Sequence, residues 1–472
     1  MRKSALSRPD PLRLAIAAIL VLTLWRLALL PFSRLELYVD EAQYWLWGQE
    51  MTFGAYSKPP LVGWMIRAAN QITGSDAPWV ARLPWPLCHA IAASAIMALA
   101  ARLATRPVAA LAGVVYASLP AVSAGSILVS TDSPMLMCLA LTLLLWHRQA
   151  GGAPDSHAVA LGAALGFGFM AKYAMLFALP GLAVAMRLPG WRLCRRDLAL
   201  ALPTALLVLA PNLVWNLQHG MATWRHTVEN ADFQGLALHP VRALRFLAEQ
   251  FAVAGPLAMA AMLAGFARRD LLALSLVAAG PLLICTAQAL NAGANANWAV
   301  GAYVPGAILA AAAMHPHRLW RAANLGLNGA IALVLPVIAT QADRLHRADG
   351  SPLLDRYVGQ EAPFLALMDR LPQPGPTLIL SDDRAVLAQL FYLARRQDRP
   401  DLVIRALPPR GRPAKSHYEL IYPLDHPIAA PAWLITRNPP ACAGPAEPFA
   451  RGLRVHPLPP ACLARITSGP ED

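Results

Sequence analysis

The stretch YVDEAQYWLWGQEMTFGAYSKPP, residues 38–60, follows directly on the first strongly apolar segment of the chain. It holds an acidic pair, Asp40 and Glu41, and ends on Lys58 and two prolines. About fifteen apolar residues precede it and a long apolar run follows it, so we expect a loop between two membrane spans. Such a loop needs no acidic pair for stability. A carboxylate there would suit an enzyme that removes a proton from a substrate hydroxyl.

The composition of the whole chain is that of a membrane protein. Its 472 residues are 57% hydrophobic and only 14% charged, whereas soluble domains carry about 25% charged residues. An excess of 40 Lys and Arg over 27 Asp and Glu gives a net charge of +13. Basic residues collect in cytoplasmic loops and at lipid headgroups. Membrane lipids therefore explain the excess, and no nucleic-acid partner is expected.

Apolar runs predict a transmembrane domain over residues 1–340 with about 11 transmembrane helices. The first run lacks a small-residue cleavage site, so we expect it to remain as a span. Two of the predicted outer loops are long, 32–80 and 215–247. The predicted spans are about 14–31, 82–101, 107–125, 134–147, 158–171, 174–188, 198–214, 248–267, 271–290, 298–314 and 322–340.

Basic clusters predict the orientation of these spans. With the N-terminus in the cytoplasm, every strong basic cluster falls on the cytoplasmic side, as the positive-inside tendency requires. The opposite face then receives the acidic pair, Lys58, Asp132, Lys172 and the loop 215–247. The odd number of predicted spans places the C-terminal segment on that same outer face. The deciding clusters are Arg102 with Arg106, Arg148, Arg187 to Arg196, Arg268 with Arg269, and Arg318 with Arg321.

Residues 341–472 differ in character and predict a small α/β domain outside the membrane. The segment is rich in proline and arginine. It contains an amphipathic helix pattern at 385–396 between short apolar runs that indicate strands. Cys442 and Cys462 are its only cysteines, and each follows Pro-Pro-Ala. We expect a disulfide between them in an oxidising compartment. The predicted strands are 377–380, 402–404, 419–422 and 433–435.

The acidic pair offers two carboxylates that point in different directions. Neighbouring side chains on a helix diverge by about 100°. Asp40 would therefore share a face with Tyr44 and Trp47, and Glu41 one with Trp45. A carboxylate beside aromatic rings suits general-base chemistry on a sugar. An Asp at this position is equally typical of a helix cap, so the spacing alone leaves both roles open.

Three basic residues of the predicted outer face are candidate ligands of a phosphate, Lys58, Lys172 and Arg225. Cations of this kind form charge-assisted bonds with phosphate, although an interfacial lysine also snorkels to the membrane surface without any ligand. Lys172 runs against the positive-inside tendency, which favours a functional role. Asp132 either caps the span that it precedes or lines a binding cavity.

Polar and aromatic residues in the same segments are candidate substrate contacts. Asn297 and Trp298 suggest hydrogen-bonding groups at the edge of a cavity. The patterns HExxH, P-loop, GxGxxG and CxxC do not occur in the sequence, so no nucleotide or other cofactor is expected. A divalent metal is left open. The candidate cavity residues are Tyr44, Trp47, Tyr56, Asp132, Tyr173, Asn297 and Trp298.

Five segments, taken in order, resemble one family of enzymes. They are DEAQYWLWG with SKPPLVGWMI, ILVSTDSPMLMCLALTLLLW, ALGFGFMAKYAMLF, PNLVWNLQHGMATWRHT and NANWAVGAY. The family is the bacterial polyprenyl-phosphate-dependent glycosyltransferases of the GT-C class, related to protein O-mannosyltransferases and lipid A aminoarabinose transferases. The C-terminal segment SDDRAVLAQLFYL is similar in kind to the outer domain of galacturonosyl- and mannosyltransferase-like members.

This resemblance implies the GT-C fold, with the site at the outer face beneath the first loop and the lipid-linked donor entering from the bilayer. It also implies a location in the inner membrane of a bacterium, with the active site and the C-terminal domain facing the periplasm. By match to the family's motif, Asp40 is the base with support from Glu41. Lys58 and Lys172 would neutralise the donor phosphate, and Asp132 would line the same cavity.

The resulting hypothesis is an inverting membrane glycosyltransferase. It moves a sugar from a donor such as undecaprenyl phosphate to an envelope glycolipid, either lipid A or lipopolysaccharide core, with a protein as a less favoured acceptor. The aminoarabinose enzymes have Glu before the Lys-Pro pair, whereas this chain has Ser57, which weakens the case for a metal site. The alternative is a flippase or transporter of lipid-linked sugars. That class predicts ionisable residues at mid-membrane depth or inverted repeats, and the sequence indicates neither.

Overall fold

The computed structural model describes residues 10–231, 237–371, 375–409, 411–426 and 428–468, apart from the side chains of Arg451 and Ser468. The chain divides into two compact units. Most of the predicted first loop belongs to the unit that also holds the C-terminal residues. Unit 1 is Met1–Ser33, Lys58–Val62 and Arg82–Thr340, and unit 2 is Arg34–Ser57, Gly63–Ala81 and Gln341–Asp472.

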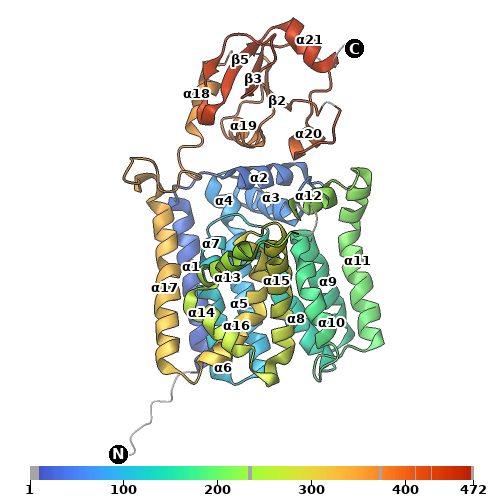
Figure 1. Cartoon of the computed structure of the whole chain (residues 1–472), viewed down its shortest axis with the longest axis vertical. Coiled ribbons are helices and arrows are strands. Elements are labelled where there is room, and N and C mark those ends of the chain that lie inside the picture. Colours follow the sequence, from blue (N-terminus) through green and yellow to red (C-terminus); the bar gives the residue numbers. More distant parts are fainter. Residues whose placement is uncertain (1–9, 232–236, 372–374, 410, 427, 469–472) are drawn as a thin grey trace, which may run out of the picture. The chain divides into compact units, whose positions relative to one another are not determined.

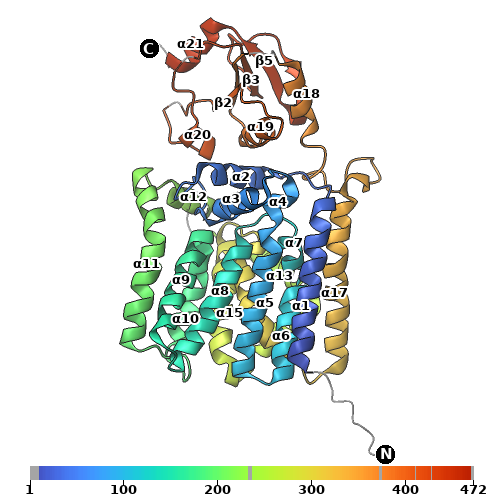
Figure 2. The ribbon, with the colours of Figure 1, turned by 180° about the vertical axis from the view of Figure 1, so that it is seen from behind.

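Unit 1 is a bundle of helices (Figure 1 and, from behind, Figure 2). In it α9 packs along α8 and α11, and α6 packs along α1, α5 and α16. Its elements are α1 (Pro11–Leu29), η1 (Leu30–Phe32), α5 (Pro84–Leu103), α6 (Arg106–Ser118), α7 (Pro120–Gly125), α8 (Asp132–Ala150), α9 (Asp155–Ala171), η2 (Tyr173–Ala178), α10 (Leu179–Ala185), α11 (Arg195–Gln218), α12 (Ala222–Ala231), α13 (Pro240–Ala254), α14 (Pro256–Gly265), η3 (Arg269–Leu271), α15 (Leu272–Asn291), η4 (Ala296–Ala302), α16 (Tyr303–Met314) and α17 (Arg318–Thr340).

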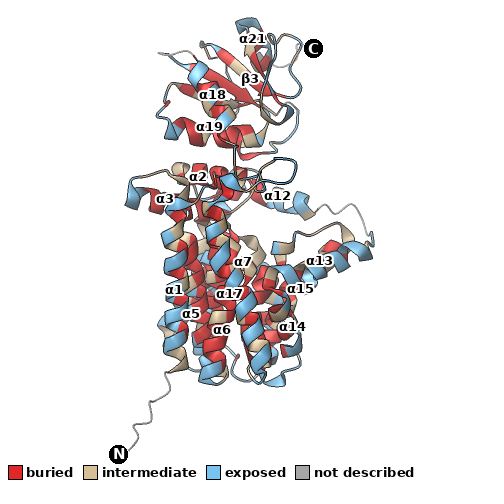
Figure 3. Ribbon diagram, turned by 90° about the vertical axis from the view of Figure 1, so that its left-hand side faces the viewer, coloured by how far each residue is buried: buried red, intermediate tan, exposed pale blue. Residues whose placement is uncertain are grey.

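The outer helices of unit 1 carry large apolar side chains on their exposed faces. Leu20 and Leu24 of α1 are 53% and 63% exposed, and Leu207 of α11 is 75% exposed. In Figure 3 the outward faces of α1 and α17 are mostly pale blue, the colour of exposed residues, whereas the interior of the bundle is red. Such faces are unfavourable in water but favourable against lipid tails. The predicted multi-pass membrane protein is confirmed.

The predicted number of about 11 spans is not confirmed. Six helices among the described residues are long and apolar enough to cross a membrane, or seven if one bent pair is counted as a single span. The predicted span 107–125 is divided into α6 and α7 at Leu119. Leu119 precedes Pro120, and the residue before a proline is disfavoured in the helical region.

The predicted span 248–267 is also divided, because α13 and α14 are bent by 108° at their junction. The junction is Gly255, whose φ is +84°. A Cβ there would lie only 2.1 Å from Oδ1 of Asn328, so the position requires glycine. Pro256 then begins α14, where its fixed φ is already helical. The sequence is apolar on both sides of Gly255, so its hydrophobicity did not indicate the break between α13 and α14.

Unit 2 contains a five-stranded sheet with the order β2-β1-β3-β5-β4. The strands β2, β1 and β3 are parallel, and β5 is antiparallel to β3 and β4. All of β1 is buried because it is a central strand. The predicted fold class, a polytopic α-helical protein with a small C-terminal α/β domain, is confirmed. The elements are η5 (Ala342–Arg344), α18 (Ala362–Arg370), β1 (Thr377–Ser381), α19 (Arg384–Arg396), β2 (Leu402–Ala406), α20 (His417–Ile421), β3 (Ala432–Thr436), β4 (Glu447–Pro448), η6 (Ala450–Gly452), β5 (Arg454–Leu458) and α21 (Pro460–Ser468).

One predicted strand is wrong. Residues 419–422 fall largely in the helix α20. Ser416 caps this helix, because its side chain accepts a hydrogen bond from the backbone N–H of Glu419 at 3.2 Å. The Glu419 carboxylate in turn accepts two hydrogen bonds from Arg412, at 2.7 and 3.0 Å. The cap and the ion pair favour a helical turn over an extended strand.

The first-loop helix α2 (Val39–Glu50) is part of the core of unit 2. Trp45 donates from Nε1 to Oδ1 of Asp76 at 3.0 Å, and its ring meets Tyr392 of α19 edge-on at 5.1 Å between centroids. Gly48 lets α2 approach α3 closely, since a Cβ there would lie 2.5 Å from the Gly63 carbonyl oxygen. The loop is thus a packed element of unit 2. The other helices of the first loop are α3 (Leu61–Thr73) and α4 (Pro78–Arg82).

Cys442 and Cys462 form a disulfide within unit 2. The two residues are separated by 20 positions, and Cys462 lies in α21 against the core of the sheet domain. The bond therefore joins the C-terminal helix to the segment that follows β3. Cys88, Cys138 and Cys285, which lie in helices of unit 1, are buried free thiols.

We expect the double change Cys442→Ser and Cys462→Ser to destabilise unit 2 while leaving activity largely intact. A loop of about 20 residues closed by a disulfide is worth about 3 kcal/mol by the chain-entropy estimate. Thermal unfolding of the purified full-length protein, with and without the two cysteines, measures the loss. Unchanged unfolding of the variant would contradict the expectation.

Candidate active site

A buried ion pair in unit 1 joins two of the residues that the sequence singled out. Lys172, which follows α9, donates from Nζ to Oδ1 of Asp132, the first residue of α8, at 2.6 Å. The side chains are only 13% and 12% exposed. Burial of charged groups is costly unless they are paired. The pair therefore fixes one cation and one carboxylate inside the bundle.

The second carboxylate oxygen of Asp132 is also occupied. Asn297 of η4 donates from Nδ2 to Oδ2 at 2.9 Å, and the Ser130 hydroxyl donates to the same oxygen at 3.2 Å. Three segments far apart in the sequence thus meet at one carboxylate. A lysine ammonium has three N–H donors, of which Asp132 takes one. The arrangement suits the binding of an anion such as phosphate by Lys172.

A second polar network continues from the next residue of the chain. Tyr173 donates its hydroxyl to Oδ1 of Asn212 at 2.5 Å and accepts from Nδ2 of Asn216 at 3.3 Å. Asn216 accepts from the backbone N–H of Thr223 at 3.2 Å, which ties the end of α11 to α12. These bonds fix Tyr173 beside the Lys172 segment.

The remaining candidates of unit 1 lie in different environments. Lys58 is half-buried in the segment Lys58–Val62. Trp298 is half-buried and packs against the apolar core next to Asn297. Arg225 lies on α12 with an exposed side chain. Of the candidates in unit 1, Lys172 and Asn297 bond directly to Asp132.

In unit 2 the two members of the acidic pair have separate roles. The N-cap of α2 is Tyr38, and the Glu41 carboxylate accepts from the Tyr38 backbone N–H at 3.0 Å in a capping box. Glu41 is only 2% exposed. Asp40 is not the N-cap, and its side chain is 42% exposed. Of the two carboxylates, Asp40 is the one accessible to a substrate.

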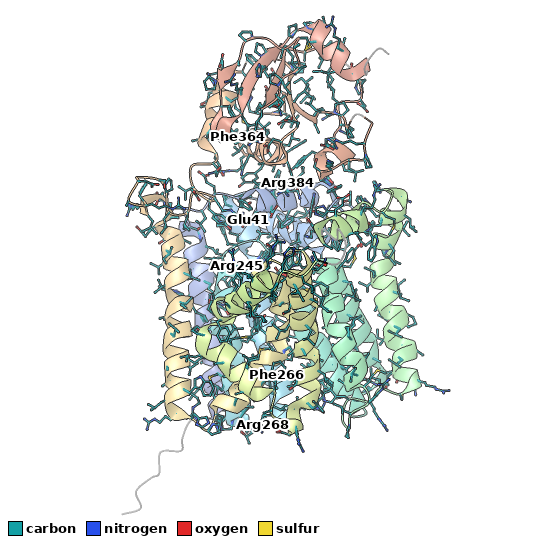
Figure 4. The ribbon with its side chains drawn as sticks, viewed as in Figure 1. Glu41, Arg245, Phe266, Arg268, Phe364 and Arg384 are labelled. Atoms are coloured by element: carbon teal, nitrogen blue, oxygen red, sulfur yellow. A yellow bond between two sulfur atoms is a disulfide. The ribbon has the colours of Figure 1, made fainter. Side chains whose placement is uncertain are left out.

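Asp40 has a partner that sequence analysis did not identify. Arg384, the first residue of α19, donates from Nη1 to Oδ1 of Asp40 at 2.8 Å, and the same nitrogen is 3.4 Å from Oε1 of Gln43. Figure 4 labels Arg384 and Glu41 on these two helices of unit 2. Burial alone would lower the pKa of Arg384, but the charge and hydrogen bond of Asp40 raise it above its ordinary value. Arg384 bonds to Oδ1 of Asp40. A proton from a substrate would therefore be taken up at the other carboxylate oxygen, Oδ2.

The aromatic candidates of the first loop are buried. Tyr44, Trp47 and Tyr56 are 8%, 2% and 7% exposed. The Tyr44 and Trp47 rings are 5.0 Å apart, and Trp47 meets His417 of α20 edge-on at 5.6 Å. These rings hold α2 against α20 within unit 2.

A further unpredicted cluster lies at the end of α2. Glu50 accepts a hydrogen bond from the Tyr422 hydroxyl at 2.7 Å and lies 3.0 Å from Nε2 of His417. Burial, together with the charge of Glu50, raises the pKa of Tyr422. No local pattern links Glu50 or Asp40 to residues more than 340 positions away, so sequence analysis had no signal for either contact. In the described part of the chain, no group of three or more His, Cys, Asp and Glu is arranged to hold a metal ion.

The sequence resembles that of one characterised enzyme over nearly its whole length. It is 36% identical over 445 residues to lipid A galacturonosyltransferase RgtD from Rhizobium johnstonii, covering 91% of this chain and 92% of that protein. Residues 57–215 match the family described as dolichyl-phosphate-mannose-protein mannosyltransferase.

Two solved structures have the same fold. The apo structure of ArnT from Cupriavidus metallidurans superposes with a TM-score of 0.61 at 16% identity, covering 97% of this chain and 99% of that one. The structure of the same protein bound to undecaprenyl phosphate gives a TM-score of 0.64 at 17% identity with the same coverage. The sequence relationship shows the family, and the superposition shows the fold. The chain belongs to the family of bacterial polyprenyl-phosphate-dependent membrane glycosyltransferases of the GT-C class, which includes lipid A galacturonosyltransferase.

Proposed function

We propose that this chain transfers a uronic acid from a polyprenyl-phosphate donor to lipid A or a related envelope glycolipid. The observation that carries the proposal is the 36% identity to a lipid A galacturonosyltransferase, which extends over 91% of the chain. The buried Lys172–Asp132 pair supports it, because a lipid phosphate requires a fixed cation close to the membrane. Undecaprenyl phosphate bound to a protein of the same fold supports the class of donor.

The proposed chemistry is a single displacement at the anomeric carbon. An acceptor hydroxyl oxygen attacks that carbon as the bond to the phosphate oxygen breaks, and the hydroxyl proton passes to Asp40. The electron pair leaves with polyprenyl phosphate. Attack from the face opposite the leaving group inverts the anomeric configuration. Asp40 suits the base because its side chain is 42% exposed, whereas Glu41 is used in the helix cap.

The leaving group in this scheme needs charge neutralisation more than it needs a proton. Lys172 is the first candidate because its ammonium is held at a known position by Asp132. Lys58 is the second cation proposed for the donor phosphate. Arg225, whose side chain on α12 is exposed, is the third candidate cation.

We propose that the active site faces the periplasm and that the strongest basic clusters of unit 1 face the cytoplasm. The support is the distribution of charge. Arg102, Arg196 and Arg268 lie near helix ends or in the short connections between helices of unit 1. Figure 4 places Arg268 at the end of the bundle away from Arg245 of α13. Basic residues at one end of a bundle are typical of the cytoplasmic side.

Reporter fusions measure this orientation. We expect fusions after Arg196 and after Arg269 to report a cytoplasmic location, and a fusion after Arg384 to report the periplasm. The physical reason is the cost of moving arginine clusters across the membrane. A cytoplasmic signal from the fusion at Arg384 would reverse the proposed orientation of unit 2.

The function itself is tested by mass spectrometry of lipid A from cells with and without the gene. We expect a species heavier by one hexuronic acid residue only when the gene is present. Purified protein in nanodiscs should form the same product from a polyprenyl-phosphate uronic acid and lipid A. An unchanged lipid A profile together with no transfer in the purified system would refute the proposal.

Arg384→Met is expected to lower the turnover number roughly 10- to 100-fold, the usual worth of a hydrogen bond to a charged group. The change removes the donor that orients Asp40 through Oδ1. Arg384→Lys should restore part of the rate because it returns a cation to the position. The matched control is Arg395→Met, which removes another α19 arginine paired with a first-loop aspartate, Asp76. Equal loss in both variants would show that Arg384 only holds α19 in place.

A further inference from the structure

A pocket in unit 2 takes no part in the proposed chemistry. Its volume is about 160 Å³, which is smaller than the roughly 300–1,000 Å³ of sites for drug-sized ligands. The start of α19, the segment 356–364 and the residues 449–453 line it, together with Val39 of α2. A cavity of this size suits one sugar ring or one small anion.

Two arginines line the pocket. Arg356 donates from Nη2 to the Tyr38 hydroxyl, and its guanidinium lies 4.6 Å from the centre of the Tyr38 ring. Arg437 is 57% exposed, and its Nη1 is 3.4 Å from Oδ2 of Asp383. A guanidinium has five N–H donors, so each arginine keeps donors for a further acceptor. The pocket can therefore take an anionic group.

The carboxylate in the pocket wall is already engaged. Asp383 caps α19, and its Oδ1 accepts from the backbone N–H groups of Ala385 and Val386 at 2.8 and 3.3 Å. The lining thus holds two arginines and one carboxylate, and that carboxylate is largely used in the cap. The charge balance of the lining favours an anion over a cation or a neutral ligand.

The pocket also contains a buried acceptor that lacks a donor. Gln389 lines the pocket and is only 3% exposed. Its Nε2 donates to the Leu37 carbonyl oxygen at 2.7 Å, while its Oε1 has no hydrogen-bond partner among the described residues. A buried acceptor without a donor costs free energy. A ligand hydroxyl would supply the missing donor.

Apolar rings complete the lining. Phe364 of α18 and Phe449 lie edge to face at 5.2 Å between centroids. Figure 4 labels Phe364 on α18 within unit 2. Rings of this kind cover the C–H faces of a pyranose. A ligand that satisfies the lining therefore has a carboxylate, hydroxyl groups and an apolar ring face.

We propose that this pocket binds an acidic sugar, that is, a pyranose with a carboxylate. Inorganic phosphate would pair with the arginines but cover no ring, and a neutral sugar would leave the arginine donors unpaired. Val39 and Ala385 of the lining are the chain neighbours of Asp40 and Arg384, and consecutive Cα atoms are about 3.8 Å apart. On the basis of the proposed function, the occupant is an acidic sugar of the acceptor glycolipid, held close to the proposed base.

The test is saturation-transfer NMR on the full-length protein in nanodiscs, with free galacturonate and free galactose as probes and inorganic phosphate as a competitor. We expect galacturonate to bind more tightly than galactose and to resist competition by equimolar phosphate. Arg437→Gln should weaken galacturonate binding roughly tenfold, because it removes a charged donor. The matched control is Arg370→Gln, an arginine of unit 2 that is 59% exposed and paired with Glu447, outside the pocket.

The outcomes separate this inference from the proposed function. Loss of binding in Arg437→Gln but not in Arg370→Gln supports the subsite even if the protein shows no transfer activity, in which case only the proposed function fails. Galacturonate binding that survives Arg437→Gln and disappears in Lys172→Met belongs to a donor site and overturns the subsite. Equal binding of galactose and galacturonate overturns it as well. Where transfer is observed, Arg437→Gln should raise KM for the acceptor and leave KM for the donor and the turnover number unchanged.

Discussion

Asp40→Asn is expected to abolish measurable sugar transfer while the protein still folds and inserts. Loss of a general base typically lowers a rate by about 10²–10⁴. The amide keeps the size of the side chain and can still accept from Arg384 at Oδ1, so the contact between α2 and α19 is retained. Only the capacity to take a proton is lost. The measurement is turnover of purified protein in nanodiscs at saturating donor and acceptor.

The matched control for this change is Asp76→Asn. Asp76 is also a first-loop aspartate with an α19 arginine partner, Arg395, at 3.6 Å. It accepts from Trp45 through Oδ1, which an amide oxygen can replace. Turnover of the Asp76 variant should therefore stay near that of the unchanged protein. Near-normal turnover of Asp40→Asn would remove Asp40 from the mechanism and leave it as a partner of Arg384 alone.

Lys172→Met is expected to lower kcat/KM for the donor roughly 10- to 100-fold, because a charge-assisted bond to phosphate is lost. The variant also leaves Asp132 as a buried carboxylate without its cation, and breaking a buried pair destabilises a protein by roughly 3–5 kcal/mol. A second variant separates the two effects. Combining Lys172→Met with Asp132→Asn removes both charges and should regain most of the stability.

If Lys172 binds the donor phosphate, the double variant remains poor in its use of the donor although it is stable. Thermal unfolding and donor titration on the same preparation give both quantities. Recovery of normal donor use by the double variant would show that the pair is structural. In that event Lys58 becomes the leading candidate for the phosphate site.

Local sequence patterns located most elements of the fold, and the misses have local physical causes. Long uninterrupted apolar runs predicted α1, α11 and α17 closely, because lipid-facing helices must be apolar along their length. Hydrophobicity does not register a bend, so the break at Gly255 was missed. Residues 419–422 are too short an apolar run to distinguish a strand from a helix by periodicity, and the cap from Ser416 decided for a helix.

The same limit applies to the candidate site. Lys172, Asp132 and Asn297 were each identified from residue type and predicted position, but nothing local indicated that they bond to one another. Lys172 is 40 positions from Asp132, and Asn297 is 165 positions from it. Pairings over such separations depend on how helices pack, which the hydrophobic pattern of each helix does not specify.

By itself, the sequence determined that the chain spans a membrane, that a small α/β domain follows, and that the acidic pair of the first loop is a candidate for catalysis. Composition and periodicity can be read from a short stretch of chain. The bilayer requires every span to be apolar and helical, so each span shows this pattern in its own sequence. The tertiary structure alone decided which carboxylate of the pair is accessible. Glu41 accepts a hydrogen bond from Tyr38, three residues before it, in the cap of α2. Asp40 instead bonds to Arg384, which is 344 positions away in the sequence. That meeting exists only because the first loop folds into the core of the same unit as α19, where burial of Trp45 and Gln389 fixes the two helices together.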